Sequence, residues 1–127
     1  MNENNVQIET YSPLTLAFLG DAVYELEVRR YICSNGSCPS GVLHKRAVQY
    51  VCAAFQSKAY DKLLDFLNEE ELAVMKRGRN ANGVAVPKSS SPKDYRKATG
   101  VEALYGYLFL KNEKTRIEQI SAYIFAE

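Results

Sequence analysis

The sequence predicts an all-α fold, a bundle of six to seven helices in a single domain over residues 1–127. Apolar residues recur at helical spacing along most of the chain, whereas the apolar–polar alternation of strands is scarce. Two helix starts are marked by a serine followed by a proline, at Ser12-Pro13 and Ser91-Pro92. With 127 residues, of which 46% are hydrophobic and 24% charged, the chain fits one globular domain and excludes collagen-like, low-complexity and disordered classes.

The first long helix is expected to begin at the Ser12 cap and to run to about Ile32. Its apolar residues cover much of its circumference, which predicts a central, buried helix. The segment Ser34-Asn35-Gly36 should end it.

Ser40 is expected to cap a second helix that starts at about Gly41. Helical periodicity then continues to Leu67, which is long enough for two helices with a break near Tyr50.

Asn68 should start a shorter helix, because Glu71 stands three residues later, as a capping box requires. Residues 80–91 are loop by composition, with glycine, proline and serine. A helix from Pro92 to about Leu110 and a last helix to about Phe125, capped by Asn112, complete the bundle.

Basic residues are concentrated in one part of a chain whose formal net charge is only +1. The segment from Lys76 to Lys97, called the basic segment below, holds seven lysines and arginines against Asp94 alone. Its charge of +6 leaves −5 for the rest of the chain. This distribution indicates a local anion-binding surface.

The cysteines and the single histidine favour no metal or nucleophile site. Cys33, Cys38 and Cys52 follow no zinc-binding spacing, and His44 alone cannot complete such a site, so reduced thiols are expected. His44 lies in a polar, basic stretch and is interpreted as a surface residue. The polar, acidic start and the absence of an apolar run of about 18 residues predict a soluble, cytoplasmic protein without membrane contact.

Two carboxylates, Asp21 and Glu102, stand within apolar helical runs. An isolated ionised carboxylate is costly to bury, so each needs a cation, hydrogen bonds or a metal ion. On two helices that face each other they would suit a hard divalent ion such as Mg²⁺. From spacing alone, pairing with arginine or lysine, or an exposed position, is the favoured alternative.

Neighbours on the same two helices are candidates for outer-sphere contacts. Glu25 lies one turn after Asp21, and Thr99 lies three residues before Glu102. Glu27 is expected to be solvated. Gly100 and Gly106 inside the second helix predict close approach of another helix or subunit.

Four motifs in order resemble a known family. The run FLGDAVYE, Phe18–Glu25, resembles the first signature of the ribonuclease III catalytic domain, and VEALYGYLFL, Val101–Leu110, resembles its second carboxylate motif. The run KRGRNA, Lys76–Ala81, and the stretch Pro87–Thr99 resemble Mini-ribonuclease III. This short bacterial branch has a catalytic domain and no double-stranded-RNA-binding domain, and the resemblance covers nearly the whole chain.

The resemblance implies a ribonuclease III-like helical fold in which Asp21 is the catalytic aspartate and Glu102 the metal-binding glutamate. The implied reaction is Mg²⁺-dependent hydrolysis of double-stranded RNA to 5′-phosphate and 3′-hydroxyl ends. Two further carboxylates of full-length ribonuclease III correspond here to Ala17 (or Thr15) and Thr99. Water must then fill the metal's coordination shell, and weaker metal binding is expected.

The basic segment is expected to contact the RNA backbone, since A-form RNA is recognised mainly through shape, phosphates and 2′-hydroxyls. The family resemblance further implies the precursor of 23S ribosomal RNA as substrate, in ribosome biogenesis, with a ribosomal protein as a candidate partner. One or two of the basic residues are alternatively expected to neutralise buried carboxylates. The candidates for RNA contact are Lys76, Arg77, Arg79, Arg96 and Lys97.

The family works as a homodimer, which implies a hydrophobic two-fold face, with packing inside one protomer as the alternative role of its residues. The candidates for this face are Leu16, Phe18, Leu19, Val23 and Tyr105.

Two other function classes stay open. A non-catalytic RNA- or ribosome-binding module on the same fold would keep the basic segment without needing acids at Asp21 and Glu102. A helical interaction protein without nucleic acid leaves the +6 segment unexplained and ranks last.

Overall fold

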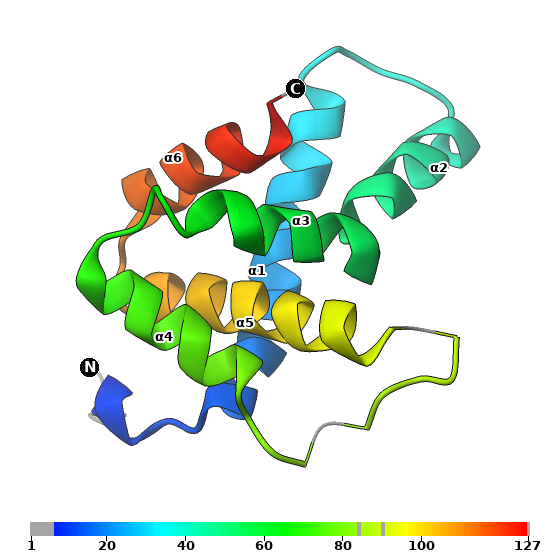
Figure 1. The fold of residues 1–127 in the computed structure, drawn as a ribbon. Coiled ribbons are helices and arrows are strands. Elements are labelled where there is room, and N and C mark those ends of the chain that lie inside the picture. Colours follow the sequence, from blue (N-terminus) through cyan, green and yellow to red (C-terminus); the bar gives the residue numbers. More distant parts are fainter. Residues whose placement is uncertain (1–6, 84, 90, 127) are drawn as a thin grey trace.

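The computed structural model describes residues 7–83, 85–89 and 91–126. The described residues form six α-helices and one short 3-10 helix, with no strand (Figure 1). This architecture confirms the prediction of an all-α bundle of six to seven helices. In chain order the elements are η1 (Ile8–Thr10), α1 (Pro13–Cys33), α2 (Ser40–Val51), α3 (Ala53–Leu63), α4 (Glu69–Arg79), α5 (Pro92–Leu110) and α6 (Lys114–Phe125).

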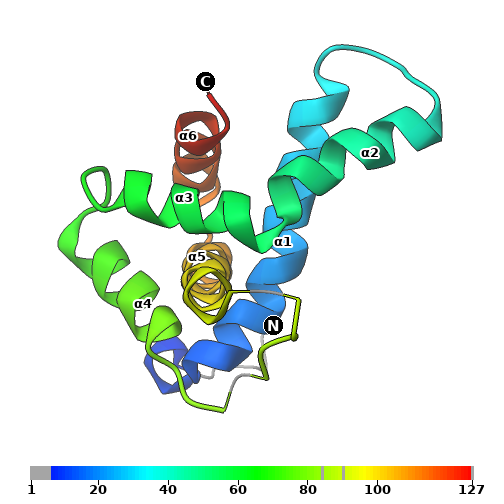
Figure 2. The same ribbon diagram turned by 45° about the vertical axis from the view of Figure 1, so that its right-hand side comes forward.

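Helix α5 runs through the centre of the bundle. It packs most extensively against α1, α4 and α3. In Figure 2 it is seen nearly end-on, between α4 and α1 with α3 above it. Because α5 is covered on several sides, it carries much of the core. Its fully enclosed side chains join those of α1, α3 and α6 in one cluster that includes Tyr24, Val28, Leu63, Leu104, Tyr105 and Ile120.

Two glycines let the backbones of α1 and α5 touch where the helices cross. A side chain at Gly20 would overlap the carbonyl oxygen of Glu102, and one at Gly106 would overlap that of Leu16. The close approach predicted at Gly106 is therefore confirmed, and the neighbour is another helix of the same protomer. The contact at Gly20 also brings the next residue, Asp21, beside the part of α5 that carries Glu102.

The predicted two-fold face is only partly exposed. Leu16, Val23 and Tyr105 are 2%, 8% and 0% exposed and pack inside the protomer, so their assignment to an interface is wrong. Since α1 is apolar around most of its circumference, its sequence does not say which side faces inward. Leu19 is half-buried, and Phe18 is 84% exposed.

The local helix-start signals of α1 and α4 are confirmed. The Ser12 hydroxyl accepts a hydrogen bond from the Thr15 amide at 3.1 Å. Asn68 and Glu71 form both bonds of the capping box, at 2.9 and 3.0 Å. These caps satisfy amide groups that the first turn of a helix leaves free.

Two predicted caps are wrong. Helix α2 begins at Ser40 itself. Pro39 occupies its N-cap position, so the helix has no side-chain cap. Asn112 does not cap α6 but ends α5, with a left-handed φ of 59°. The amide of Glu113 then donates to the Leu108 carbonyl at 2.9 Å. Asparagine tolerates this conformation better than most residues, which explains the different role.

The breaks between helices lie close to their predicted positions. Gly36, with φ of 106°, lies in the turn that follows α1. The extended backbone of Cys52 separates α2 from α3, two residues after Tyr50. The described part of the predicted loop 80–91 is free of helix and strand. Val84 and Ser90 of that loop lie outside the described residues.

Glu27 is not solvated as expected. Its side chain is 11% exposed and pairs with Arg30 at 3.3 Å. The same guanidinium reaches Glu118 of α6, also at 3.3 Å. Glu27 therefore belongs to an ion-pair group that links α1 to α6.

The three cysteines are free thiols, as expected, and Cys33 and Cys52 are exposed. Among the described residues, no helix combines the length and apolar character needed to cross a membrane.

Candidate active site and basic cleft

Asp21 of α1 and Glu102 of α5 lie near each other where the two helices cross, close enough for the Asp21 carboxylate to raise the pKa of Glu102. We call these two residues the acid pair. Asp21 is exposed, whereas Glu102 is half-buried. Neither takes part in an ion pair within the described part of the chain. The arrangement thus places two acids together with no arginine or lysine to balance them.

The surroundings of Glu102 disfavour its charged form. Burial raises the pKa of Glu102 to about 7, and the neighbouring charge of Asp21 contributes to the rise. A hydrogen bond from the side chain of Gln56 opposes it and lowers the pKa. A carboxyl group that stays protonated until nearly neutral pH, beside a second carboxylate, is the kind of group found at functional sites.

Gln56 is a site residue that the sequence analysis missed. It lies on α3 and is only 3% exposed. The signal that would have found it is its register, since it stands one turn before Tyr60 and two turns before Leu63 on the buried face of α3. A polar residue at such a position needs a hydrogen-bond partner, and Glu102 is one.

Two buried tyrosines follow the acid pair by three residues, Tyr24 on α1 and Tyr105 on α5. Tyr24 packs edge-on against Tyr105, with ring centroids 5.2 Å apart. Its hydroxyl donates to the Tyr50 carbonyl at 2.5 Å, which ties α1 to the end of α2. Burial and the nearby charges, including that of Glu102, hold the pKa of Tyr24 far above its ordinary value. Of the two rings, that of Tyr24 lies near enough to Glu102 for the charge of the carboxylate to act on it.

The two outer-sphere candidates already have partners. The Glu25 carboxylate pairs with Arg29 at 2.6 Å. The Thr99 hydroxyl is buried and donates to the Tyr95 carbonyl at 3.0 Å, within its own helix. Both keep lone pairs that can accept a further hydrogen bond, but neither side chain is a free carboxylate beside the acid pair.

The donor set of the acid pair fits a hard divalent ion. Carboxylate oxygens are the protein ligands that Mg²⁺ prefers, and Mg²⁺ keeps several of its waters. Among the described residues, no group of three or more histidines, cysteines, aspartates and glutamates is arranged to hold a metal ion. Two protein ligands would therefore hold the ion, and water or substrate would supply the rest of its coordination.

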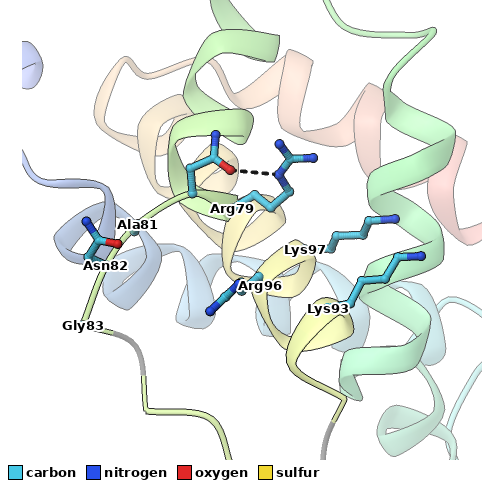
Figure 3. A pocket seen from close by; sticks show the side chains of 8 residues that line it. Arg79, Ala81, Asn82, Gly83, Lys93, Arg96 and Lys97 are labelled. Carbon is cyan, nitrogen blue, oxygen red and sulfur yellow. Dashed lines mark hydrogen bonds between the residues drawn. The ribbon is translucent and has the colours of Figure 1, made fainter.

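A basic cleft of about 440 Å³ opens between the end of α4 and the start of α5 (Figure 3). Lys93 and Lys97 point to one side of α5, and Arg96 points to the other, toward residues 81–83. Lys97 and Glu102 are five residues apart on α5, a rise of about 8 Å along the helix. The cleft is thus formed at the start of the same helix that carries Glu102 further along. Its lining residues are Arg79, Asn80, Ala81, Asn82, Gly83, Lys93, Arg96 and Lys97.

The cleft contains three of the five basic residues predicted to contact RNA, Arg79, Arg96 and Lys97, and adds Lys93. Arg77 lines a neighbouring hollow beside the start of α1, with Ser12, Pro13 and Leu14. Lys76 is exposed on α4 and lines neither.

The basic segment was also expected to neutralise buried carboxylates, and this is wrong for the described residues. Lys97 pairs with Asp61 at 2.8 Å, but the Asp61 side chain is 55% exposed. The buried carboxylate is Glu71, whose partner is Arg116 of α6. Because Glu71 and Arg116 are far apart in the chain, no local sequence pattern predicts that they pair.

Comparison with known proteins gives a consistent result. Residues 14–113 match the model of the ribonuclease III domain. The Mini-ribonuclease 3 of Clostridium tetani is 46% identical over 114 residues, which cover 89% of this chain and 76% of that protein. The Mini-ribonuclease 3 of Symbiobacterium thermophilum is 43% identical over 111 residues, covering 87% and 85%. A crystal structure of a Fusobacterium nucleatum protein superposes with a TM-score of 0.82 at 36% identity, covering 93% of this chain and 94% of that one.

Proposed function

This chain belongs to the ribonuclease III domain family and is an endoribonuclease, and we propose that it hydrolyses double-stranded RNA at Asp21 and Glu102. The resemblance noted in the sequence motifs is thereby confirmed at the level of the family. The observation that carries the proposed site is the acid pair itself. Two carboxylates meet at the crossing of α1 and α5 with no cation paired to either among the described residues, and a cleft lined by four cations opens at the start of the same helix α5.

Asp21 and Glu102 would together hold Mg²⁺ at the scissile phosphate. When bound, the ion lowers the pKa of a coordinated water and stabilises charge on the phosphate. The residues around Glu102 determine how readily it becomes charged and can bind the ion. Gln56 donates a hydrogen bond to Glu102 and favours its charged form, whereas burial of Glu102 opposes it. Hydrolysis would leave 5′-phosphate and 3′-hydroxyl ends.

The basic cleft would bind the RNA backbone. Its cations Arg79, Lys93, Arg96 and Lys97 lie at the end of α4 and the start of α5, the helix that carries Glu102, and we infer that a duplex held there by its phosphates extends to Asp21 and Glu102. Lys76 and Arg77, outside the cleft, remain predicted contacts farther along the duplex.

A homodimer would supply one acid pair for each strand. The exposed apolar residues Phe18, Ala22 and Leu26 recur every four positions on α1 and form a stripe next to Asp21. Phe18 is 84% exposed and Leu26 58% exposed. Pairing two copies through this stripe would cover apolar surface and bring two active sites to one duplex.

The precursor of 23S ribosomal RNA is the proposed substrate, trimmed in the cytoplasm during ribosome maturation, with a ribosomal protein as candidate helper. These finer assignments rest on the resemblance of the sequence motifs to Mini-ribonuclease III. The competing proposal is that the chain is a module with the same fold that binds RNA or the ribosome without cleaving RNA.

The test is cleavage of a labelled RNA duplex in Mg²⁺, alongside Asp21→Asn and an EDTA control. Cuts on both strands with 5′-phosphate ends, absent from both controls, are the expected result. A wild-type protein that binds the duplex but never cuts it, over a range of salt and Mg²⁺, would favour the binding module.

A further inference from the structure

The four cations of the basic cleft fall into two classes. Lys93 and Arg96 are exposed and make no hydrogen bond or ion pair within the described part of the chain. Arg79 and Lys97 are half-buried and have fixed surroundings. The Arg79 guanidinium carbon and the Lys97 Nζ each lie 5.7 Å from the centroid of one ring, that of Tyr60. A single aromatic side chain thus contacts one cation from α4 and one from α5.

Tyr60 is held rigidly where α3 meets α5. It is 1% exposed. Its Cε2 lies so close to Gly100 of α5 that a methyl group there would approach it to 3.2 Å. The next residue of α3, Asp61, binds Lys97 at 2.8 Å. The ring and the neighbouring carboxylate together form a fixed support for Lys97.

The Arg79 side chain is fixed in place, but not all of its hydrogen-bond donors have a partner. Its Nε donates to the Asn80 side chain at 3.2 Å. Within the described residues, no hydrogen bond engages its two Nη groups. These groups are the donors that a phosphate oxygen would need.

We propose that Tyr60 is a positioning residue of the basic cleft: its ring face holds Arg79 and Lys97 in place to receive phosphate groups of bound RNA. This inference rests on the proposed function, which supplies the ligand. A lysine or arginine that is free in solution loses rotamer freedom when it binds a phosphate. Cations already held over a ring lose less, so they contribute more to affinity.

The ring, and not the hydroxyl, is the part assigned this role. The Tyr60 hydroxyl is the one buried side-chain polar atom of the described residues that makes no hydrogen bond. A buried hydroxyl without a partner does not stabilise the fold. Phenylalanine at this position should therefore support the cations as well as tyrosine does.

The test varies the charge distribution of the ring while keeping its shape. Tyr60→Phe, Tyr60→3,5-difluorophenylalanine and Tyr60→3,4,5-trifluorophenylalanine fill the same space, but fluorine progressively removes the negative charge of the ring face that attracts cations. Each is made in the Asp21→Asn background, so that binding of an RNA duplex is measured without cleavage. The dissociation constant should stay within about twofold for Tyr60→Phe and rise stepwise to about three- to tenfold for the trifluorinated ring.

Salt dependence separates positioning from loss of charge. The fluorinated variants keep all four cations, so the slope of log K against log salt should not change. Lys97→Met is the matched control, and it should reduce that slope by about one. A merely structural ring would give equal affinity across the fluorinated series. That result, or Tyr60→Phe binding as weakly as the trifluorinated variant, would overturn the proposal.

A readout without RNA distinguishes this proposal from the proposed function. The NMR signal of the Arg79 Nε–H group should carry a ring-current shift that Tyr60→Leu removes. If that shift is absent from the otherwise intact protein, the positioning role fails whatever RNA does. If it is present but the unsubstituted protein does not bind the duplex, RNA is not the ligand and the proposed function fails.

Discussion

Glu71 and Glu102 are two carboxylates withdrawn from solvent, and the protein treats them in opposite ways. Glu71 is 4% exposed, and Arg116 binds both of its oxygens at 2.8 Å. Burial raises the pKa of Glu71, but the hydrogen bonds from Arg116 and from the Asn68 amide outweigh it, so the pKa lies below its ordinary value. Glu102 instead faces Asp21, and its pKa is raised to about 7.

This difference separates a structural carboxylate from one that we propose to be functional. The fold can supply a guanidinium to a buried acid, as it does for Glu71, where the ion pair and the helix cap act together. At Glu102 it supplies a second acid and one neutral amide. A buried carboxylate without a counter-charge destabilises the folded protein. Such groups are typical of functional sites.

The largest effect should follow from disrupting the acid pair. Asp21→Asn keeps the size of the side chain but removes the charge, and it should lower the cleavage rate of an RNA duplex by about 10³-fold or more. Duplex binding and thermal unfolding of the variant should remain close to those of the unsubstituted protein, because Asp21 is exposed. Cleavage within tenfold of the original rate would show that Asp21 has no catalytic role.

The next largest effect concerns the structural carboxylate. Arg116→Met leaves Glu71 buried without its counter-charge, and the free energy of unfolding should fall by about 3 kcal/mol at pH 7. The pKa of Glu71 in the folded protein is depressed. Its stabilising contribution is therefore present above its ordinary pKa and lost as the pH falls through the folded value.

Urea unfolding at pH 7 and at pH 4 measures this. The deficit of Arg116→Met should shrink at the lower pH, while the cleavage rate per folded molecule stays unchanged. An equal deficit at both pH values would assign the loss to packing of the arginine stem instead of its charge.

Matched substitutions at the two glutamates should have effects of opposite sign. The pKa of Glu102 is raised from 4.5 to about 7, so its contribution to stability is fully present below pH 4.5 and lost as the pH rises through 7. In EDTA at pH 8, Glu102→Gln should therefore raise the free energy of unfolding, by about 1–3 kcal/mol. At pH 4 the gain should vanish.

Glu71→Gln is the control, and at pH 8 it should be destabilising, since it weakens the hydrogen bonds that the Glu71 side chain accepts from Arg116 and from the Asn68 amide. Urea unfolding of both variants in parallel provides the measurement. If Glu102→Gln were destabilised at pH 8 as Glu71→Gln is, Glu102 would be a structural carboxylate too.

The sequence predicted what local patterns control. The caps at Ser12 and Asn68 and the break before α3 depend on a few neighbouring residues, and the structure contains them. Ser40 and Asn112 carry the same kind of signal and do not cap their helices. A capping side chain is one of several uses for a serine or an asparagine, and the backbone around it selects which one.

Contacts between side chains far apart in the chain could not be predicted from the sequence. Arg116 lies 45 residues from Glu71, and nothing near either residue indicates the other. At the proposed active site, nothing in the sequence near Gln56 or Glu102 indicates that the two residues contact each other. The motifs around Asp21 and Glu102 marked both acids, but not the amide between α3 and α5 that contacts one of them.

The smallest effect should come from substituting Gln56. Its neutral amide is the hydrogen-bond donor to Glu102, whereas the donor to Glu71 is the charged guanidinium of Arg116. The hydrogen bond from Gln56 lowers the pKa of Glu102, so Gln56→Leu should raise that pKa further and make the charged carboxylate scarcer at neutral pH. The cleavage rate at pH 7 should fall by about three- to tenfold, and the acid limb of the pH–rate profile should move to higher pH. Raising the pH to 9 should restore most of the lost rate, because the proton is then removed without help from the amide. A profile that keeps its shape and is lowered equally at every pH would mean that Gln56 supports the packing of α3 and does not act on Glu102.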